Sequence, residues 1–478
     1  MNSERIKLKE KIGYGLGDAA SNMFWKIFSM YSLFFYTDVF GIPAAAAGTM
    51  FLIARLWDSF FDLGVGIVAD RTRTRWGKYR PYLLWFAIPF SVMGAITFFV
   101  PDFGQTGKLV YAYVSYSLMM IIYSIINVPY ASLLGVMSPN PKERNVLSSF
   151  RMCFAFIGSF ITFMLLQPLV DFFARTLDSG AFVQNTTTAV ETAISNSSVG
   201  WFWAVASIGC ICAVLFFLCF YLTRERVEAV NKEENENVSV KQDLKQLFHN
   251  APWWILVATG LASLLFNAVR DSVAIFYFRD YVQISYRMAG TGWDLTTIYF
   301  LVGQAANIAG VVLAPFISAK YGKRNTYMIA MLIAAVLSVV FFFIPNTIVW
   351  ILIFQILISI CAGYVLPLLW SMFSDIVDYQ ELKTGRRASG LIFSSSSMSQ
   401  KLGWAFGAGL GGWILAIFHY NPDIMQQLPE TILGERLMLS IFPAICALLA
   451  VVGIIFYPLT EKRVKQISDE LEKSRNKS

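Results

Sequence analysis

The sequence predicts an all-α polytopic membrane protein with twelve transmembrane helices in two six-helix halves. Of its 478 residues, 56% are hydrophobic and 14% are charged, whereas soluble proteins carry about 25% charged residues. Apolar windows long enough to cross a bilayer recur along the whole chain, and about 20 apolar residues suffice for one crossing. A long charged segment, 223–250, separates these windows into two sets of six.

The expected helices are the apolar windows between charged or Pro/Gly-rich breaks. The first six lie near 13–37, 45–69, 81–101, 109–135, 149–170 and 201–222, and the other six near 253–278, 294–318, 326–345, 348–374, 389–418 and 437–457. The predicted parts are an N-terminal bundle at 1–222, a cytoplasmic linker at 223–250, a C-terminal bundle at 251–460 and a tail at 461–478.

Basic residues predict the orientation of these helices. The tails and loops on one side hold 28 of the 38 Lys and Arg residues, and the opposite loops hold 5. Loops rich in Lys and Arg stay on the cytoplasmic side. We therefore expect both termini to be cytoplasmic, in a bacterial inner membrane.

A similar inner loop occurs at corresponding places in the two halves. The segment GIVADRTRTRWGKYRP follows the second span, and APFISAKYGKRN follows the eighth. Either loop alone has a simpler interpretation, because a Gly-Lys-Arg run can merely end a span. The matched positions favour an internal duplication, the arrangement in which transporters rock two bundles about a central site.

Other classes of protein fit poorly. The net charge of +7 is spread over short loops, so we expect no nucleic-acid partner. The two histidines, His249 and His419, lie at span ends, and the sequence contains neither an H-E-x-x-H nor a G-x-S-x-G motif, two common catalytic patterns. We expect a protein that is not an enzyme and has no cofactor.

Charged residues at membrane depth are the strongest functional signal. A charge in mid-helix costs about 2.5 to 3.5 kcal/mol on insertion scales, so each needs a partner or a role. Five are basic and four acidic, which indicates pairing inside the bundle; they are Asp18, Lys26, Arg55, Asp58, Asp62, Arg151, Arg270, Asp271 and Lys401. The simplest alternative is a set of internal salt bridges that bind nothing.

Spacing groups several of these residues. Asp18, Asn22 and Lys26 recur every four residues on the first span and form one polar stripe. On the second span, Asp58 and Asp62 lie one turn apart. Two carboxylates so close repel each other in a low dielectric, and a bound cation or proton relieves that repulsion.

Two further spans supply polar groups for the same cavity. Tyr123, Ser124 and Asn127 on the fourth span are neutral oxygen donors, which small hard cations prefer. Lys401 on the eleventh span lies about 13 residues from the inner surface, too deep to snorkel easily. We expect Lys401 to meet Asp58 or Asp62.

The sequence resembles the glycoside–pentoside–hexuronide:cation symporters of the major facilitator superfamily over nearly its whole length. The segments that carry the resemblance are KEKIGYGLGDAASN, FFYTDVFGIPAAAAGTMFLIARLWDSFFD, GIVADRTRTRWGKYRPY, YSIINVPYASL, SDIVDYQELKTGRRASG and SSSSMSQKLGWAFG. The resemblance implies the major facilitator fold. It also implies that Asp58, Asp62 and Ser124 bind the cation, that Lys401 links the cation and sugar sites, and that Arg151 lies near the sugar.

In a galactoside-transporting member of the family, two carboxylates bind the sugar, and the corresponding residues here are the amides Asn22 and Asn127. That member also has a tryptophan four residues after the second carboxylate, where this chain has Ala131. The amides keep the hydrogen-bonding capacity and remove two negative charges. With Lys26, Arg151 and Lys401 nearby, the cavity becomes more electropositive. A sugar that carries a carboxylate, a hexuronide, is one expected substrate, and neutral pentosides or glucosides are the other.

We therefore expect a secondary active transporter that imports a glycoside, pentoside or hexuronide with Na⁺ or H⁺ through alternating access. The expected cation ligands are Asp58, Asp62, Ser124 and Asn127, the two aspartates being the metal ligands if the ion is Na⁺. The expected substrate ligands are Asp18, Asn22, Lys26, Tyr123, Asn127, Arg151, Ser397 and Lys401. The protein is expected to be a monomer in the lipid bilayer. The alternative is a cation-coupled lysolipid transporter of the same fold.

Overall fold

The computed structural model describes residues 6–138, 141–177, 197–226, 247–283, 293–384, 389–422, 424 and 426–475. Within these ranges the chain is built of helices, and the expected all-α class is confirmed. The chain divides into two compact units. Unit 1 comprises Met1–Asn231, Phe278–Leu301 and Gly412–Leu428, and unit 2 comprises Lys232–Tyr277, Val302–Gly411 and Pro429–Ser478.

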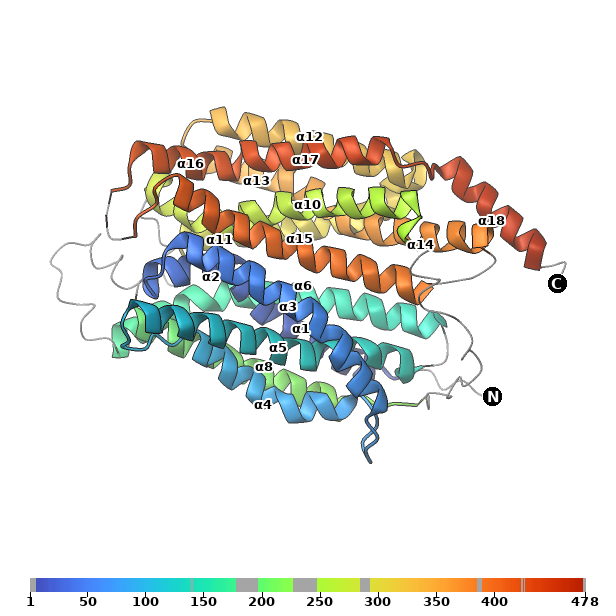
Figure 1. Ribbon diagram of the computed structural model, residues 1–478, viewed down its shortest axis with the longest axis horizontal. Coiled ribbons are helices and arrows are strands. Elements are labelled where there is room, and N and C mark those ends of the chain that lie inside the picture. The colour runs from blue at the N-terminus through green and yellow to red at the C-terminus, as the bar shows by residue number, and fades with distance from the viewer. Residues whose placement is uncertain are drawn as a thin grey trace. The chain divides into compact units, whose positions relative to one another are not determined.

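Unit 1 contains the first six expected spans. They are α1 (Leu8–Lys26) with its continuation to Val39, α3 (Ala44–Arg71), α4 (Arg80–Thr97), α5 (Gln105–Met137), α6 (Pro141–Leu177) and α8 (Ser198–Leu222). Helix α1 packs against α6 and α8, and α4 packs against α5 and α8; Figure 1 shows these helices as blue, cyan and green ribbons. The aromatic rings of α1, α4 and α8 fill the space between them, for example Phe24 against Phe90 at 4.7 Å.

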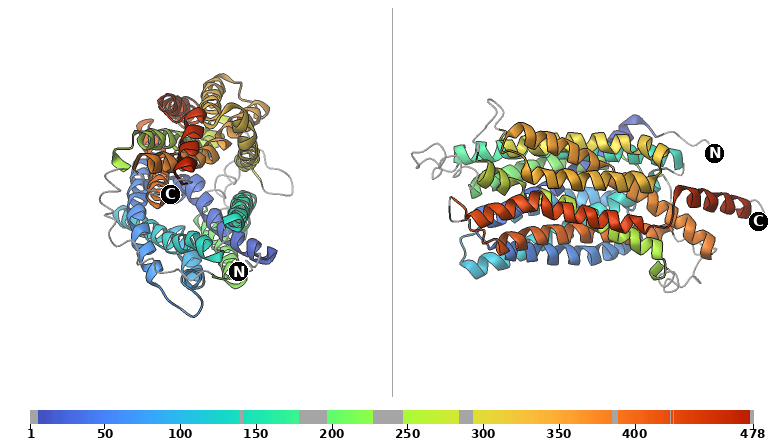
Figure 2. Two further views of the ribbon diagram at one scale, coloured as in Figure 1. Left: turned by 90° about the vertical axis from the view of Figure 1, so that its right-hand side faces the viewer. Right: turned by 90° about the horizontal axis from the view of Figure 1, so that it is seen from above.

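Unit 2 contains most of the remaining spans. They are α10 (Ala251–Phe276), α11 (Leu295–Tyr321), α12 (Lys323–Phe343), α13 (Ile348–Gly363) with α14 (Val365–Thr384), α15 (Ser389–Ile417), and α16 (Pro429–Leu439) with α17 (Ile441–Ile455). The unit's buried core includes Leu256, Tyr327, Met331 and Ile454. Helix α17 packs against α10 and α12, and the amphipathic α18 (Glu461–Arg475) packs against α14; Figure 2 shows these helices from two further directions.

Eight of the described helical segments are long and apolar enough to cross a membrane: 105–137, 146–177, 198–222, 251–282, 295–321, 323–343, 348–383 and 429–455. The other four expected spans, α1 with its continuation, α3, α4 and α15, are also helical. The expected boundaries of the two six-helix halves stay a prediction, and most of the expected linker, 227–246, lies outside the described residues.

The two similar inner loops end in the same turn. Gly77 has φ +110° and Gly322 has φ +83°, a conformation that residues with a Cβ atom seldom adopt. A Cβ at Gly77 would lie 2.5 Å from Glu225, and one at Gly322 would lie 2.7 Å from Glu461. In both loops a glutamate side chain from just beyond the last span of the half therefore fills the space that the glycine leaves, through its carboxylate at Gly77 and its Cγ methylene at Gly322.

These carboxylates also accept from backbone N–H groups just before or at the first residue of the next helix. Oxygens of Glu225 accept from the backbone of Lys78, Tyr79 and Arg80 at 2.8, 2.8 and 2.9 Å. Glu461 accepts from the backbone N–H of Lys323 at 2.7 Å. A negative charge at a helix N-terminus satisfies donors that have no partner inside the helix and stabilises the helix dipole.

The first helix of each half ends in a π-helical turn. Helix α1 passes through η1 (Ile27–Tyr31) and α2 (Ser32–Phe34) into η2 (Phe35–Val39), and α10 continues into η5 (Tyr277–Val282). π-Helical turns are rare and frequent at functional sites. Both turns contain an aspartate, Asp38 in η2 and Asp280 in η5.

Candidate functional site

Asp18 is the first residue of the polar stripe on α1. It is buried, with 5% of its surface exposed. The Arg151 side chain reaches it from α6, with 3.1 Å between Arg151 Nε and Asp18 Oδ1. An isolated charge would be strongly disfavoured in this apolar surrounding, so the pair neutralises a carboxylate and a guanidinium that α1 and α6 bring together.

Two tyrosines hold Arg151 in place. Its guanidinium lies 5.4 Å from the centre of the Tyr130 ring. The Tyr130 ring stacks on Tyr14 at 4.9 Å, and the Tyr130 hydroxyl donates to the Tyr14 carbonyl oxygen at 2.7 Å. Cation–π contact adds to the ion pair when the cation is shielded from water. The Arg151 side chain is therefore positioned by α1, α5 and α6 together.

Asp58 on α3 is also buried, with 6% of its surface exposed. The Ser124 hydroxyl of α5 donates to Asp58 Oδ1 in a close hydrogen bond. Asp62 lies one turn further along α3 and is half-buried. A hydroxyl both donates and accepts, so Ser124 can hydrogen-bond an empty carboxylate or turn its lone pairs toward a bound cation.

Asn127 connects α5 to α1. Its side-chain oxygen lies 3.1 Å from the hydroxyl of Ser21, which is able to donate to it. Ser124 and Asn127 are three residues apart, so they lie on one side of α5. The expected oxygen donors of the fourth span therefore contact the two helices that carry Asp18 and Asp58.

Trp25 lies between a cation and a phenol ring. The Arg55 guanidinium of α3 is 5.0 Å from the centre of the Trp25 ring. Tyr123 of α5 lies on another side, with 5.9 Å between the ring centres. Arg55 is buried, with 3% of its surface exposed. The three side chains bring α1, α3 and α5 together.

The remaining stripe residues of α1 are less closely engaged. Asn22 donates to the Asp18 carbonyl oxygen of its own helix at 2.9 Å. The Lys26 ammonium lies 5.8 Å from the centre of the Phe163 ring on α6. Both side chains are half-buried. The structure thus places Asn22 and Lys26 on the face of α1 that also carries Asp18.

Lys401 and Ser397 belong to α15 within unit 2. Lys401 is half-buried, and the side chain of Ser397 lies outside the described residues. The expected contact of Lys401 with Asp58 or Asp62 would join unit 2 to unit 1, so it stays a prediction.

Three residues of this cluster escape prediction from the sequence: Ser21, Trp25 and Tyr130. They are neutral, so the cost of charge at membrane depth does not single them out. A signal was available, because Gly17, Ser21 and Trp25 form a second row with spacing of four residues beside Asp18, Asn22 and Lys26. Since a helix turn takes 3.6 residues, adjacent rows share a face.

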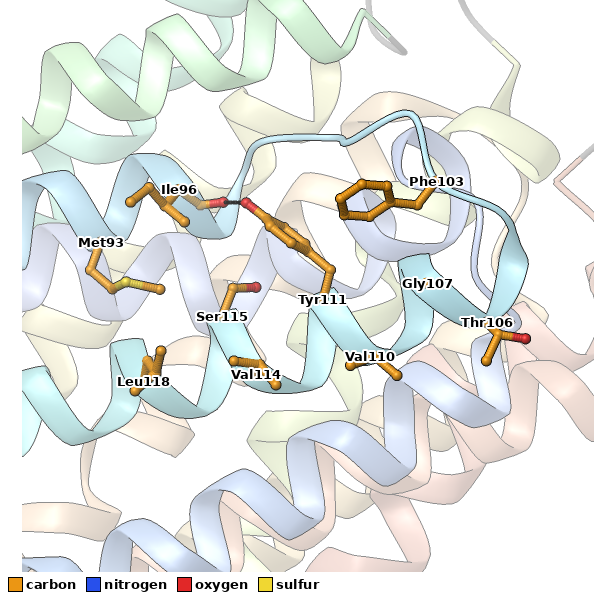
Figure 3. Close-up of a pocket in the computed structure, with 10 residues that line it drawn as sticks. All are labelled: Met93, Ile96, Phe103, Thr106, Gly107, Val110, Tyr111, Val114, Ser115 and Leu118. Atoms are coloured by element: carbon orange, nitrogen blue, oxygen red, sulfur yellow. Dashed lines mark hydrogen bonds between the residues drawn. The ribbon is translucent and has the colours of Figure 1, made fainter.

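A separate hollow of about 750 Å³ lies between α4 and α5. Figure 3 shows its lining, which is almost entirely apolar, and the hydrogen bond that the Tyr111 hydroxyl donates to the Ile96 carbonyl oxygen at 2.7 Å. Exposed side chains such as Val110 and Val114 line it. It lacks the polar groups that a sugar needs, so it is not the candidate site. Among the described residues, no group of three or more His, Cys, Asp or Glu could hold a metal ion.

Comparison with known proteins identifies the family. The family model described as "MFS/sugar transport protein" matches residues 13–461. The chain belongs to this family. It is 34% identical to a putative glycoside/cation symporter of Escherichia coli (strain K12) over 98% of this chain and 96% of that protein. It is 33% identical to the isoprimeverose transporter of Lactiplantibacillus pentosus, over 98% and 92% of the two chains.

A third relative is the glucuronide carrier protein homolog of Escherichia coli (strain K12), 33% identical over 98% of this chain and 96% of that one. A solved structure of a D-xylose–proton symporter covers 94% of this chain and 96% of its own, with TM-score 0.61 and 16% identity. Membership and fold confirm the expected major facilitator class and the resemblance to glycoside–pentoside–hexuronide:cation symporters. This symporter-family chain is a multi-pass membrane transport protein.

Proposed function

We propose that this protein imports a glycoside, pentoside or hexuronide together with Na⁺ or H⁺ across a bacterial inner membrane, with both termini in the cytoplasm. The observation that carries the proposal is Asp58, a buried carboxylate that shares a close hydrogen bond with Ser124 and has Asp62 one turn away. Relatives named as glycoside/cation symporters, together with the family match, support it. Lysolipid transport is not favoured, because the similar proteins carry names of sugar or glycoside transporters.

The cation is proposed to occupy Asp58 and Asp62, with Ser124 and Asn127 as neutral ligands. Two carboxylates one turn apart repel each other, and a small cation or a proton relieves the repulsion. A sodium ion needs several oxygen ligands at once, whereas a proton needs one carboxylate. Neutralisation of the two aspartates is the step that would prepare the neighbouring groups for sugar.

The sugar is proposed to bind beside the stripe on α1. The proposed ligands are Asp18, Asn22, Lys26, Tyr123, Asn127, Arg151, Ser397 and Lys401. Trp25 borders them, with its ring in contact with Tyr123 and Arg55. Cation and sugar would then raise each other's affinity by the same factor, as linkage requires.

The charge balance of unit 1 bears on the substrate. Lys26, Arg55 and Arg151 carry three positive charges, and Asp18, Asp58 and Asp62 carry three negative charges. A bound cation therefore leaves this set with one net positive charge, to which Lys401 would add another. A site of this sign favours a sugar with a carboxylate, and one relative is named as a glucuronide carrier homolog.

The test combines binding and uptake. Purified protein is heated with a panel of sugars, with NaCl or with choline chloride at equal ionic strength, and the melting temperature is recorded. A sugar that raises the melting temperature more in NaCl identifies both the substrate class and the ion. In right-side-out vesicles, a glucuronide should compete for uptake more strongly than the matching glucoside.

Equal competition by the two sugars would count against the anionic substrate. A counterflow experiment separates a carrier from a channel, because only a carrier accumulates labelled sugar against a preloaded unlabelled pool. Failure of counterflow with every sugar that binds would overturn the proposed transport function.

A further inference from the structure

The π-helical turns η2 and η5 both contribute residues to one charged cluster inside unit 1. Aligned on their aspartates, the turns read Phe-Tyr-Thr-Asp at 35–38 and Tyr-Phe-Arg-Asp at 277–280. Asp38 and Asp280 therefore occupy the same place in the two halves, and Arg279 stands where the first half has Thr37. Because unit 1 includes Phe278–Leu301, Asp38 and Arg279 belong to the same unit.

Arg279 joins both aspartates. It forms two hydrogen bonds with its neighbour Asp280, from Nε to Oδ1 at 2.7 Å and from Nη2 to Oδ2 at 2.8 Å. Its Nη1 donates to Asp38 Oδ1 in a close ion pair. It also donates to the Tyr420 hydroxyl at 2.6 Å, and that hydroxyl donates to Asp38 Oδ1 at 2.5 Å. We call Asp38, Arg279, Asp280 and Tyr420 the latch.

The two carboxylates of the latch are shielded from solvent, and the Arg279 side chain is 27% exposed. The Asp38 side chain is 1% exposed and that of Asp280 is 4% exposed. Burial raises the pKa of Tyr420, so its hydroxyl keeps its proton and can donate to Asp38. Charge-assisted hydrogen bonds of this kind are about twice as strong as neutral ones. Loss of Arg279 would leave two buried carboxylates without a compensating charge.

The segments next to Asp38 and Tyr420 in the sequence also pack closely against each other. The indole Nε1 of Trp413 donates to the Thr49 hydroxyl at 3.0 Å. A Cβ atom at Gly412 would lie 2.3 Å from the Ala44 carbonyl oxygen, so α3 and the end of α15 touch through backbone. This end of the helices is the one that the Lys and Arg count predicts to face outward.

We propose that the latch closes the outward end of the transport path and that Arg279 must release Asp38 and Tyr420 before sugar can enter. The inference rests on the proposed transport function and names the residues that gate it. The contacts of Arg279 differ in kind. Its pair with Asp280 lies within one turn and survives a separation of the helices, whereas its contacts with Asp38 and Tyr420 join segments far apart in the sequence.

The retained pair makes opening reversible. With Asp280 still bound, the guanidinium stays ionised and oriented after it leaves Asp38. The latch can therefore close again without reorienting the Arg279 side chain. Asp38, once released, would present a carboxylate at the mouth of the path. Its charge would draw cations toward the opening.

The test measures access to Thr49, which lies against Trp413. A full-length Thr49→Cys variant, with the six native cysteines replaced by serine, is purified into nanodiscs and labelled with a maleimide. Arg279→Gln and Asp38→Asn should each raise the labelling rate about tenfold, the factor that corresponds to about 1.4 kcal/mol. Tyr420→Phe, which removes one hydroxyl, should raise it about threefold by the same conversion.

Matched controls isolate the latch from general damage. Arg175→Gln and Asp102→Asn remove the same charges from exposed positions of unit 1 and should leave the labelling rate unchanged. The exchange Asp38→Arg with Arg279→Asp restores opposite charges and should bring the rate back toward that of the parent.

Labelling that is unchanged in both Arg279→Gln and Asp38→Asn, with melting temperatures near that of the parent, would overturn the latch. Faster labelling that the charge exchange leaves uncorrected would also overturn it, because it would indicate loosened packing. The readout needs no substrate, so its failure is distinct from a failure of the proposed transport, which only binding and counterflow report.

Discussion

Each unit buries charge inside an apolar helix bundle, but the two units hold that charge differently. In unit 2, Arg270 on α10 donates to the Leu439 carbonyl oxygen at 2.7 Å and to Gln355 at 2.9 Å, and lies 5.8 Å from the ring centres of Phe266 and Phe341. These contacts tie α10 to its neighbours. A guanidinium with such acceptors and rings is suited to cross-linking helices.

In unit 1, by contrast, Asp58 shares a hydrogen bond with a hydroxyl that can rotate, and Asp62 lies one turn away. A carboxylate has about four lone-pair sites, and Ser124 can change from donor to ligand. The difference teaches that a buried charge alone does not mark a site. The hydrogen-bond partner of the charge decides whether the charge can serve a binding site. A backbone carbonyl oxygen only accepts, whereas a hydroxyl can stop donating to a carboxylate and turn its lone pairs toward an incoming ion.

The largest expected effect comes from Asp58→Asn. The amide keeps the shape and removes the charge that would bind the cation, so concentrative uptake should fall by at least about tenfold, since a hydrogen bond to a charged group contributes about 1.5 to 3 kcal/mol. Uptake in right-side-out vesicles, with the substrate found in the binding panel, measures it. Asp171→Asn is the matched control, because Asp171 is a buried carboxylate of α6 that bonds Gln167 at 3.2 Å.

Asp62→Asn should be milder and should separate binding from coupling. Asp62 is half-buried, so water can replace part of its charge interaction, and we expect uptake to weaken or lose its dependence on the cation gradient. The ratio of uptake with and without the gradient reports this. Normal accumulation by both aspartate variants would defeat the assignment of the cation site.

Asp18→Asn tests the charge balance at the proposed sugar site. The change removes the carboxylate that pairs with Arg151, so a half-buried guanidinium becomes free to meet an anionic sugar. We expect the affinity for a glucuronide to rise severalfold relative to that for the matching glucoside, about the factor that 1 kcal/mol gives. A parallel loss for both sugars would instead indicate that Asp18 and Arg151 serve the structure alone.

Arg270→Met is the counterpart in unit 2. The Gln355 amide and the Leu439 carbonyl oxygen lose a donor, which costs about 1 to 3 kcal/mol for each buried group left unsatisfied. The melting temperature should fall, while the ratio of uptake with and without the cation gradient stays that of the parent. A changed ratio would show that the buried charge of unit 2 also takes part in coupling.

The smallest effects should come from the two loop carboxylates. Glu225→Gln removes the charge from a group that accepts three backbone N–H bonds, and Glu461→Gln from one that accepts a single bond. Helix-terminal charges contribute about 0.3 to 2 kcal/mol, so both variants should melt at lower temperature, Glu225→Gln more so. A larger fall in melting temperature for Glu461→Gln than for Glu225→Gln would mean that the two glutamates do not stabilise their loops in the same way.

Particular residues show how far the sequence reaches. Asp58 and Ser124 lie on different expected helices, and their contact was expected from the chemistry of hard cations rather than from spacing. The pairing of Arg151 with Asp18 was not predicted, because the sequence does not say which of nine charges at membrane depth meet. The expected span 253–278 ends just before Arg279, whereas in the structure Arg279 continues α10 as part of η5, with a side chain that is 27% exposed. A π-helical turn shifts residues around the axis, which a search based on ordinary helix period cannot detect.

The sequence by itself determined the class, the helical segments, the matched inner loops and the charges that need explanation, because each depends on local hydrophobicity and on the cost of charge in a bilayer. Only the tertiary structure decided which charges are partners: Arg151 with Asp18, Ser124 with Asp58, and Arg279 with Asp38, Asp280 and Tyr420. The physical reason is that pairing depends on rotation and contact of helices distant in the chain, and periodicity within one helix carries no record of its neighbours.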